Sequence, residues 1–307
     1  MNGSFVGANP RLPWPLNRSA WWTRPVRAER LAVLRIGVGL AVMFDILLTY
    51  LPYTELLYGA GSLGAPDPLG NAFTSRLWFW SPLGDVGSQW IWIVILLTWA
   101  ASAGLLALGL RPKIAAAACL LIALFVSNAN PYIFNSGDSV RDILLFYLML
   151  SPSGAVWSFD SRNDPSEEVY VSPWSLRVLF VQMAIIYLVN GISKAQSQIW
   201  LNGGALHYIL STHDWSLLSI SLPFWMTRIA TWVTLIWELA FVLLVANRPT
   251  RKVTLWIGVM FHVATLLTLR IGFFGIYMLC FYLPLLPWDR WRDQMRKRSP
   301  KLANQPA

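Results

Sequence analysis

The chain contains the run LAVLRIGVGLAVMFDILLTYL at residues 31–51, followed at once by Pro52. A helix needs about 20 mostly apolar residues to cross the hydrocarbon core of a bilayer, and this run has that length. Its only charged side chains are Arg35 and Asp45. The run is therefore typical of a transmembrane helix rather than of a helix in a soluble core.

Working outward from this run, we find seven more apolar runs. They lie at residues 90–110, 114–126, 143–150, 174–192, 226–246, 253–269 and 271–286. The predicted fold is an all-α polytopic membrane bundle of about eight transmembrane helices. Residues 194–224 are semi-polar and aromatic, which predicts an interfacial or re-entrant segment between helices five and six. We expect a basic N-terminal segment at 1–30, the membrane domain at 31–286, and a basic tail at 287–307.

The composition agrees with a membrane protein. Of 307 residues, 56% are hydrophobic and 13% are charged, whereas soluble domains carry about 25% charged residues. These values exclude a disordered chain, a disulfide scaffold and an ordinary soluble enzyme. The net charge is +9, but the basic residues lie between apolar runs, so we expect no nucleic-acid partner. Cys119 and Cys280 both lie inside apolar runs, which favours buried thiols over a disulfide.

The basic residues also indicate an orientation. With eight spans and a cytoplasmic N-terminus, most of the 24 lysines and arginines fall on the cytoplasmic side. We therefore expect both termini in the cytoplasm of a cell that we take to be bacterial, with residues 128–142 and 194–224 outside. No signal peptide is recognisable in the first thirty residues, so the first span is expected to act as its own insertion signal.

Polar residues inside apolar runs mark candidate sites, because a charge in hydrocarbon costs about 2.5–3.5 kcal/mol on insertion scales. In the predicted topology most of them converge on the outer half of the bundle. We expect Lys194 and His262 to be catalytic. The expected polar partners in the cavity are Asp45, Glu238, Asp138, Arg141 and His207, and Arg35 is expected to be structural.

Each of these residues also has a plain structural interpretation. Lys194 could extend to the interface from a helix end, and Asp138 could cap the fourth helix. His262 could be a satisfied interior histidine, and Glu238 could form an internal ion pair with Arg35. His207 could be an ordinary interfacial residue. No histidine or cysteine spacing is typical of a metal site, so no metal is predicted.

Several local patterns occur together in one order. They are LAVLRIGVGL at 31–40, NP at 130–131, NSGD at 135–138 with Arg141, YLVNGISK at 187–194, WLNGGALHY at 200–208, WELA at 237–240, FH at 261–262 and IGFF at 271–274. In this order they resemble the horizontally transferred transmembrane (HTTM) family. The resemblance runs from about residue 30 to residue 286. That family includes the membrane part of the vitamin K-dependent gamma-glutamyl carboxylases.

The resemblance implies a role for Lys194. In the carboxylases a lysine at the matching place is held to be the base that deprotonates vitamin K hydroquinone, which implies a reduced quinone as cofactor here. The carboxylase pattern has a second lysine where this chain has Ser193, and a histidine in the loop that here reads NSGD. We also expect this chain to lack the large extracytoplasmic region with which carboxylases bind their substrates.

Three functional hypotheses remain open from the sequence. The first is a membrane enzyme with an outward-facing site for a lipid-soluble, quinone-like molecule, acting on a secreted or membrane peptide. The second is a non-catalytic maturation or export accessory that binds a lipid or a partner peptide. The third is a transporter, which is disfavoured because the chain has no repeated pair of broken spans.

Overall fold

The computed structural model of the chain describes residues 19–58, 62, 88–130, 133–161, 168–218 and 221–288. Helices dominate these residues, and the only strands among them are the short β1 (Val26–Arg27) and β2 (Tyr170–Val171). The all-α prediction is therefore confirmed. Most of the predicted N-terminal segment and nearly all of the predicted tail lie outside the described residues, so the boundaries of those segments stay predictions.

Within the described residues, five helices are long and apolar enough to cross a membrane. They are Glu29–Leu57, α4 (Gln89–Leu108), α5 (Pro112–Ala129), α7 (Trp174–Ala195) and α10 (Phe224–Ala246). The first of them is continuous but changes its winding, from α2 (Glu29–Asp45) through η1 (Ile46–Tyr50) and η2 (Leu51–Tyr53) to α3 (Thr54–Leu57). These five agree with the predicted spans one, two, three, five and six.

The other three predicted spans differ from the structure. Span four is longer than predicted, because α6 (Ser136–Leu150) begins within the expected outer loop. Span seven is α11 (Arg248–Thr268), which also starts earlier, in its basic first turn. Span eight is mostly not α-helical, since only α12 (Phe274–Cys280) and the 3₁₀ turn η5 (Leu283–Leu285) form.

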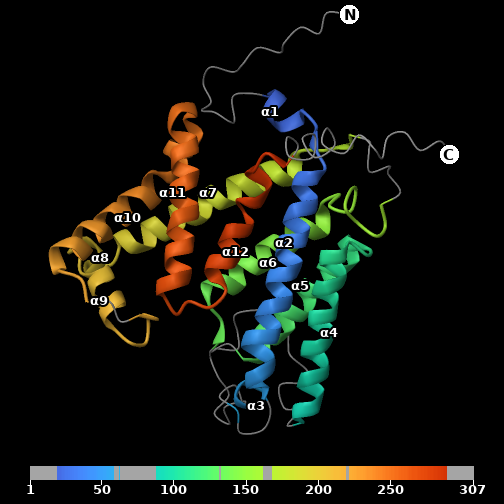
Figure 1. Cartoon of the computed structure of the whole chain (residues 1–307), viewed down its shortest axis with the longest axis horizontal. Coiled ribbons are helices and arrows are strands. Elements are labelled where there is room, and N and C mark those ends of the chain that lie inside the picture. The colour runs from blue at the N-terminus through green and yellow to red at the C-terminus, as the bar shows by residue number, and fades with distance from the viewer. Residues whose placement is uncertain are drawn as a thin grey trace, which may run out of the picture. The chain divides into compact units, whose positions relative to one another are not determined.

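The chain divides into two compact units. The first unit comprises Met1–Arg24, Ser136–Val140 and Pro173–Leu279, and the second comprises Pro25–Asn135, Arg141–Ser172 and Cys280–Ala307. Helix α6 contributes its first residues to the first unit and the rest to the second. Figure 1 labels the helices of both units.

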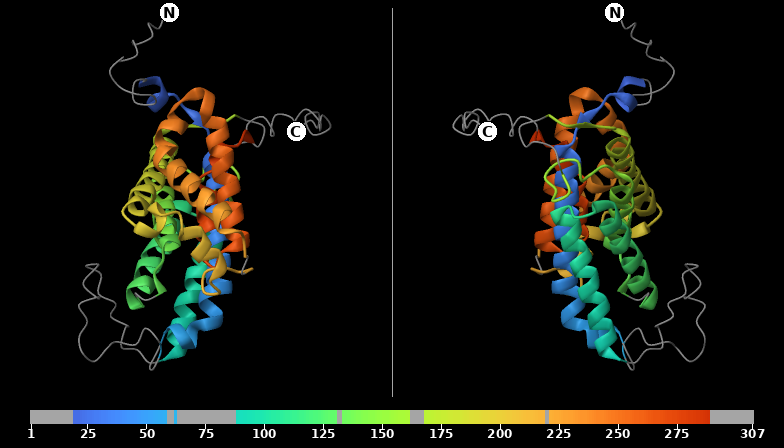
Figure 2. Two further views of the ribbon diagram at one scale, coloured as in Figure 1. Left: turned by 90° about the vertical axis from the view of Figure 1, so that its left-hand side faces the viewer. Right: turned by 90° about the vertical axis from the view of Figure 1, so that its right-hand side faces the viewer.

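In the second unit α2 packs against α4, and α4 packs against α5. Helices α2 and α4 lie side by side in both views of Figure 2. A β-carbon at Gly39 would lie 2.7 Å from the backbone nitrogen of Ala107 and 2.9 Å from the carbonyl oxygen of Ala103. The two backbones can approach this closely only with glycine on α2, as is common where membrane helices pack.

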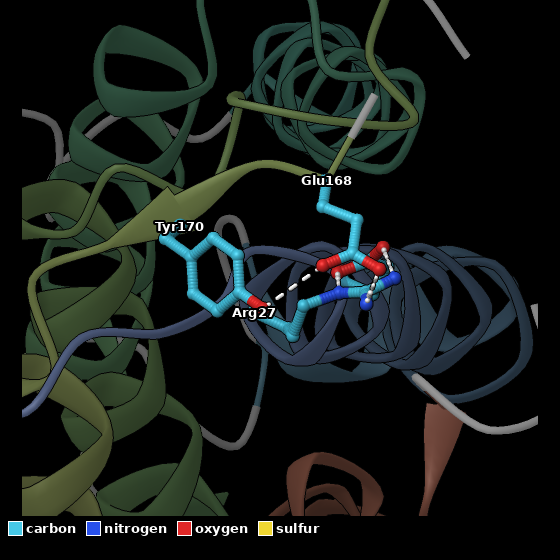
Figure 3. Close-up of polar contacts among 4 residues, drawn as sticks. Arg27, Glu168 and Tyr170 are labelled. Carbon is cyan, nitrogen blue, oxygen red and sulfur yellow. Dashed lines mark hydrogen bonds and ion pairs between the residues drawn. The ribbon is translucent and has the colours of Figure 1, made fainter. Parts of the chain in front are cut away.

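A small polar cluster closes one end of the second unit. Val26 pairs with Val171, and Arg27 with Tyr170, in the antiparallel register of β1 and β2. The guanidinium of Arg27 lies 2.9 Å from the carboxylate of Glu168, which also accepts a hydrogen bond from the Tyr170 hydroxyl at 3.0 Å (Figure 3). These contacts hold the chain before α2 against the chain before α7.

In the first unit α7 packs along α10, and α11 packs against α10 (Figure 1). The core between them is rich in aromatic rings, with Tyr187, Trp237 and Phe241 all buried. The segment predicted to be interfacial contains two short helices, α8 (Gln198–Leu201) and α9 (Ala205–Ser211). Both contact α10, and α8 also contacts α7. At the other end, α1 (Ser19–Thr23) contacts α7, where the guanidinium of Arg177 lies over the ring of Trp21.

Candidate functional site

One face of α7 carries the residues around which the site is built. Tyr187, Gly191 and Lys194 are spaced four and three residues apart, so they lie on the same side of the helix. Gly191 is where α7 comes closest to α10, because a β-carbon there would lie 2.9 Å from the backbone nitrogen of Leu239. This close approach brings the next turn of α7, with Lys194, within reach of α10.

Lys194 forms an ion pair with Glu238 of α10. The ammonium donates to both carboxylate oxygens of Glu238 at 2.5 Å. The Glu238 side chain is only 4% exposed, whereas the Lys194 side chain keeps 23% of its exposure. The lysine nitrogen also lies 5.0 Å from the centre of the Trp200 ring, which favours a positive charge at this place.

A second polar pair lies on the neighbouring turns. The hydroxyl of Tyr187 and Nε2 of His262, on α11, are hydrogen-bonded at 2.6 Å, and both residues are buried. The Tyr187 ring stacks on Phe241 with 4.0 Å between centroids, and the ring of His262 meets those of Phe261 and Phe274 edge to face.

Trp237 completes the aromatic lining beside Glu238. Its ring meets Tyr187 at 4.9 Å, Phe241 at 5.5 Å and Phe261 at 5.5 Å. The residue is 8% exposed, and its indole nitrogen has no hydrogen-bond partner among the described residues. An indole N–H that is buried without an acceptor is uncommon, and it can donate to an oxygen of a bound molecule.

We call these residues the Lys194 site: Tyr187, Gly191, Lys194, Trp200, Trp237, Glu238, Phe241, Phe261 and His262. All of them belong to the first unit. Chemically the site offers an ammonium and a carboxylate in contact, a hydrogen-bonded phenol–imidazole pair, and flat aromatic surfaces. No three His, Cys, Asp or Glu side chains gather in the described part of the chain in a way that could hold a metal ion.

Two more predicted site residues lie in the first unit at other places. His207, on α9, is half-buried, and its Nδ1 lies 3.4 Å from the hydroxyl of Thr227 at the start of α10. Asp138 is buried in the first turn of α6, where a negative charge favours the helix terminus. The position of Asp138 fits the interpretation of it as a helix-terminal residue.

Three further predicted residues, Arg35, Asp45 and Arg141, belong to the second unit. Asp45 is buried at the end of α2. Arg141 is fully buried, with its guanidinium 5.0 Å from the ring centre of Trp99. It donates to Asp142 at 3.0 Å, and more weakly to the hydroxyls of Tyr50 and Ser127 at 3.4 Å.

The suggested ion pair between Glu238 and Arg35 is wrong. The partner of Glu238 is Lys194. Arg35 is fully buried and donates instead to the backbone carbonyls of Ser153, at 2.9 Å, and of Trp157. A guanidinium has five donors in a fixed fork, so it can hold a loop through its carbonyls without an acidic partner.

With this geometry established, the comparison with known families is decisive. A family model described as the HTTM domain matches residues 23–291. The chain belongs to the HTTM family. The match covers both units and the whole Lys194 site. No curated protein gives a significant match to this HTTM protein, and no solved structure does. Family membership and the apolar helices together establish an integral membrane protein.

Sequence reasoning missed six residues of the site, among them Phe241 and Phe261. Tyr187, Gly191 and Trp200 lie within the quoted patterns YLVNGISK and WLNGGALHY, but they carry no charge and were given no role. Trp237 precedes Glu238 and was read only as part of the WELA pattern. The signal that could have found Tyr187 and Gly191 is their helical spacing from Lys194.

Proposed function

We propose that this HTTM protein is a membrane enzyme in which Lys194 acts as a base on a lipid-soluble, quinone-like substrate or cofactor. The observation that carries the proposal is the ion pair between the half-buried Lys194 and the buried Glu238. Ionisable residues within membrane-spanning helices are costly and mark functional sites, and burial disfavours their charged forms, which favours the movement of a proton between them. Membership of a family that includes the carboxylases supports the same assignment.

The residues of the site fit an aromatic molecule with polar oxygens. Tyr187, Phe241 and Phe261 present ring surfaces, and Trp237 has an indole N–H without an acceptor among the described residues. When bound, a reduced quinone would supply a hydroxyl group whose proton a base can remove. The chain's own part is to orient such a ring, to exclude water, and to accept the proton.

Lys194 and Glu238 can accept that proton together. In an ion pair the lysine is already protonated and is no base. In a dry site the shared proton can move to the carboxylate, which leaves a neutral amine beside a neutral acid at little electrostatic cost. The partial exposure of Lys194 then provides a route for the proton to water once it has been taken up.

The Tyr187–His262 pair has a positioning role in this proposal. At 2.6 Å the hydrogen bond ties α7 to α11 next to the ion pair. One ring nitrogen is thereby committed to the tyrosine, which fixes the orientation of the imidazole. His262 thus belongs to the proposed catalytic site, and it stands in the FH pattern that resembles the family.

We further propose that the protein crosses the membrane of a bacterial cell eight times, with both termini in the cytoplasm and the Lys194 site facing outward. The basic residues of the inner loops support this orientation. Helices α6, α11 and α12 with η5 would provide the three spans beyond the five long apolar helices. The short helices α8 and α9 would lie at the outer interface, where a secreted or membrane peptide could reach the site.

The alternative is a non-catalytic accessory that binds a lipid or a partner peptide. One observation favours it, because an ion pair between α7 and α10 also joins two helices, whatever its chemistry. In that case only the positive charge of Lys194 would matter. The alternative therefore predicts that any cation that still reaches Glu238 will preserve function.

Replacement of Lys194 by arginine separates the two. Arginine keeps the charge and can pair with a carboxylate in two-pronged fashion, but it does not release its proton near neutral pH. We expect Lys194→Arg to insert and fold normally and to lose the protein's activity, scored as the phenotype of cells in which the native gene is replaced. Lys252→Arg, at an exposed lysine of α11, is the matched control. Full activity of Lys194→Arg would contradict the enzyme and favour the accessory.

Identification of the bound molecule comes from a second experiment. The purified protein is extracted with organic solvent, and the extract is analysed by mass spectrometry for prenylated quinones. We expect a quinone at near-equal molar ratio in the wild type and a loss from Trp237→Phe, which keeps the ring and removes the N–H. An extract without quinones from protein that is still folded would argue against this class of substrate.

A further inference from the structure

The second unit contains a groove that the proposed function does not use. It encloses about 470 Å³ between the first turn of α5 and the chain that follows α6. Its lining includes Arg111, Lys113, Ile114, Pro152 and Ala155. All of these residues belong to the second unit, so the groove does not depend on how the two units are arranged.

The groove has a charged mouth and an apolar wall. Arg111 and Lys113 are exposed, and neither side chain has a hydrogen bond or ion pair with any described residue. The carboxylate of Asp160 accepts the backbone N–H of Arg111 at 2.5 Å and so caps the helix. Two positive charges are thus left to face a ligand, beside a surface of proline, alanine and isoleucine.

An exposed apolar stripe leads away from these charges along α5. Ile114 is 64% exposed and Leu121, seven residues on, is 61% exposed, so both lie on the same side of the helix. The face between them is made of alanines, which are too small to interrupt it. A molecule with an anionic head at Arg111 and Lys113 could lay a hydrocarbon chain along this stripe.

The groove is built rigidly. Arg35, from inside the unit, holds the carbonyls of Ser153 and Trp157. On the other side, the hydroxyl of Ser158 donates to the carbonyl of Gly109 at 2.5 Å, which ties this loop to the turn between α4 and α5. The wall of the groove is therefore already in place before any ligand binds, which lowers the entropic cost of binding.

The same loop indicates the level of the membrane surface. Trp157 is 42% exposed and Phe159 is 72% exposed. Exposed aromatic residues next to basic ones are typical of the boundary between hydrocarbon and headgroups. The positive-inside rule assigns the basic turn at Arg111 to the cytoplasmic side, where anionic lipids attract basic pockets between transmembrane helices.

We propose that this groove binds an anionic phospholipid of the inner leaflet. The phosphate group lies between Arg111 and Lys113, and one acyl chain follows Ile114 and Leu121 along α5. The charge favours an anionic over a zwitterionic lipid, and the apolar stripe favours a lipid over a free phosphate. The proposal does not rest on the Lys194 site and stands whether or not the protein is an enzyme.

The test uses the full chain purified in a neutral detergent, with melting temperature measured as lipid is added. Phosphatidylglycerol should raise the melting temperature of the wild type, because a ligand that binds only the folded state stabilises it. Phosphatidylcholine and inorganic phosphate should have no comparable effect. The double variant Arg111→Gln/Lys113→Gln should need about tenfold more phosphatidylglycerol for the same rise.

The matched control is Arg248→Gln/Lys252→Gln. It also removes two exposed charges from the first turn of a helix, α11, but outside the groove, and it should respond like the wild type. An equal response in the groove variant and the control would overturn the site, and an equal response to phosphatidylcholine would overturn the role of charge. Protection by phosphate alone would overturn the lipid assignment. If the double variant does not fold, Lys113→Gln and Ile114→Ser are measured singly, with the same expected weakening.

Discussion

Replacement of Glu238 by leucine should destabilise the protein strongly, because it leaves a lysine without its counter-charge. Breaking a fully buried ion pair by removing one partner costs about 3–5 kcal/mol. Lys194 keeps 23% of its side-chain exposure, so water can solvate part of the orphaned charge, which reduces the expected cost to about 2–3 kcal/mol. For a domain of this size the melting temperature should then fall by about 5–10 °C.

Two companion variants make the measurement specific to the pair. Glu238→Gln keeps an acceptor for the ammonium and should lose clearly less than Glu238→Leu. Lys194→Met/Glu238→Leu replaces both charges by apolar groups and should recover most of the loss, as expected for a coupled pair. The control is Glu168→Gln, which breaks an ion pair whose carboxylate is 48% exposed and should cost less than about 1 kcal/mol.

The assay is thermal unfolding of the detergent-solubilised protein, followed by intrinsic tryptophan fluorescence. If Glu238→Leu has the same melting temperature as the wild type, the carboxylate does not compensate the charge of Lys194 and the pair has no energetic role. If the double variant melts no higher than the single one, the two residues are not coupled. Either result would refute the reasoning, whatever the outcome of the activity tests.

Three further expectations follow from the same geometry. Gly191→Ala should lower the melting temperature, because its β-carbon would lie 2.9 Å from the backbone of α10 and overpacking costs about 1–3 kcal/mol of unfolding free energy. The control is Gly104→Ala, whose β-carbon would meet only a side-chain sulfur at 3.9 Å. Tyr187→Phe should reduce activity while lowering the free energy of unfolding by no more than about 2 kcal/mol, since one hydrogen bond to the histidine is lost. A cysteine at Ser299 should react with impermeant thiol reagents only in opened cells, whereas one at Asn202 should react in intact cells; the reverse pattern would invert the proposed topology.

The long helices could be predicted from the sequence because the apolar runs and the glycine or proline residues that end helices agree there. The turn between α4 and α5 is marked by Gly109, which adopts a positive φ of 79°, and by Pro112 in the first turn of the next helix. At α6 the two signals conflict. Polar residues at 135–142 read as a loop, yet the helix continues through them, because Arg141 finds hydroxyl, carboxylate and aromatic partners in the fold.

The segment of the last predicted span is only partly regular α-helix, for the opposite reason. Residues 271–286 are apolar throughout most of their length, so hydropathy alone predicts one helix. Gly272 instead takes a positive φ of 58° and Pro284 lies in a 3₁₀ turn, which leaves only Phe274–Cys280 in regular α-helix. Gly275 packs against the carbonyl of His262, where a β-carbon would lie 3.2 Å away. Tertiary packing of this kind is not visible in a hydropathy pattern.

Lys194, Glu238 and His262 were predicted as site residues, but their contacts were not, and the other predicted site residues lie elsewhere. Depth along each helix placed Lys194 at a helix end and Glu238 near the middle of another, so their pairing was not expected. The pairing depends on the length of the lysine side chain and on the close approach of α7 to α10 at Gly191. The requirement that Glu238 have a polar partner from another helix follows from the cost of a buried charge alone, and the structure satisfies it.

That cost also bears on why a lysine and a glutamate occupy this place at all. Two apolar residues of similar volume would join α7 to α10 at least as well, since the desolvation of a buried ion pair offsets most of its attraction. Stability therefore gives little reason for the pair, whereas a site that takes up and releases a proton can use two groups that share one. The partial exposure of Lys194, the buried carboxylate of Glu238 and the unpartnered indole N–H of Trp237 among the described residues are what such a site requires. For this reason the ion pair supports proton chemistry in the HTTM protein more than it supports a purely structural tie.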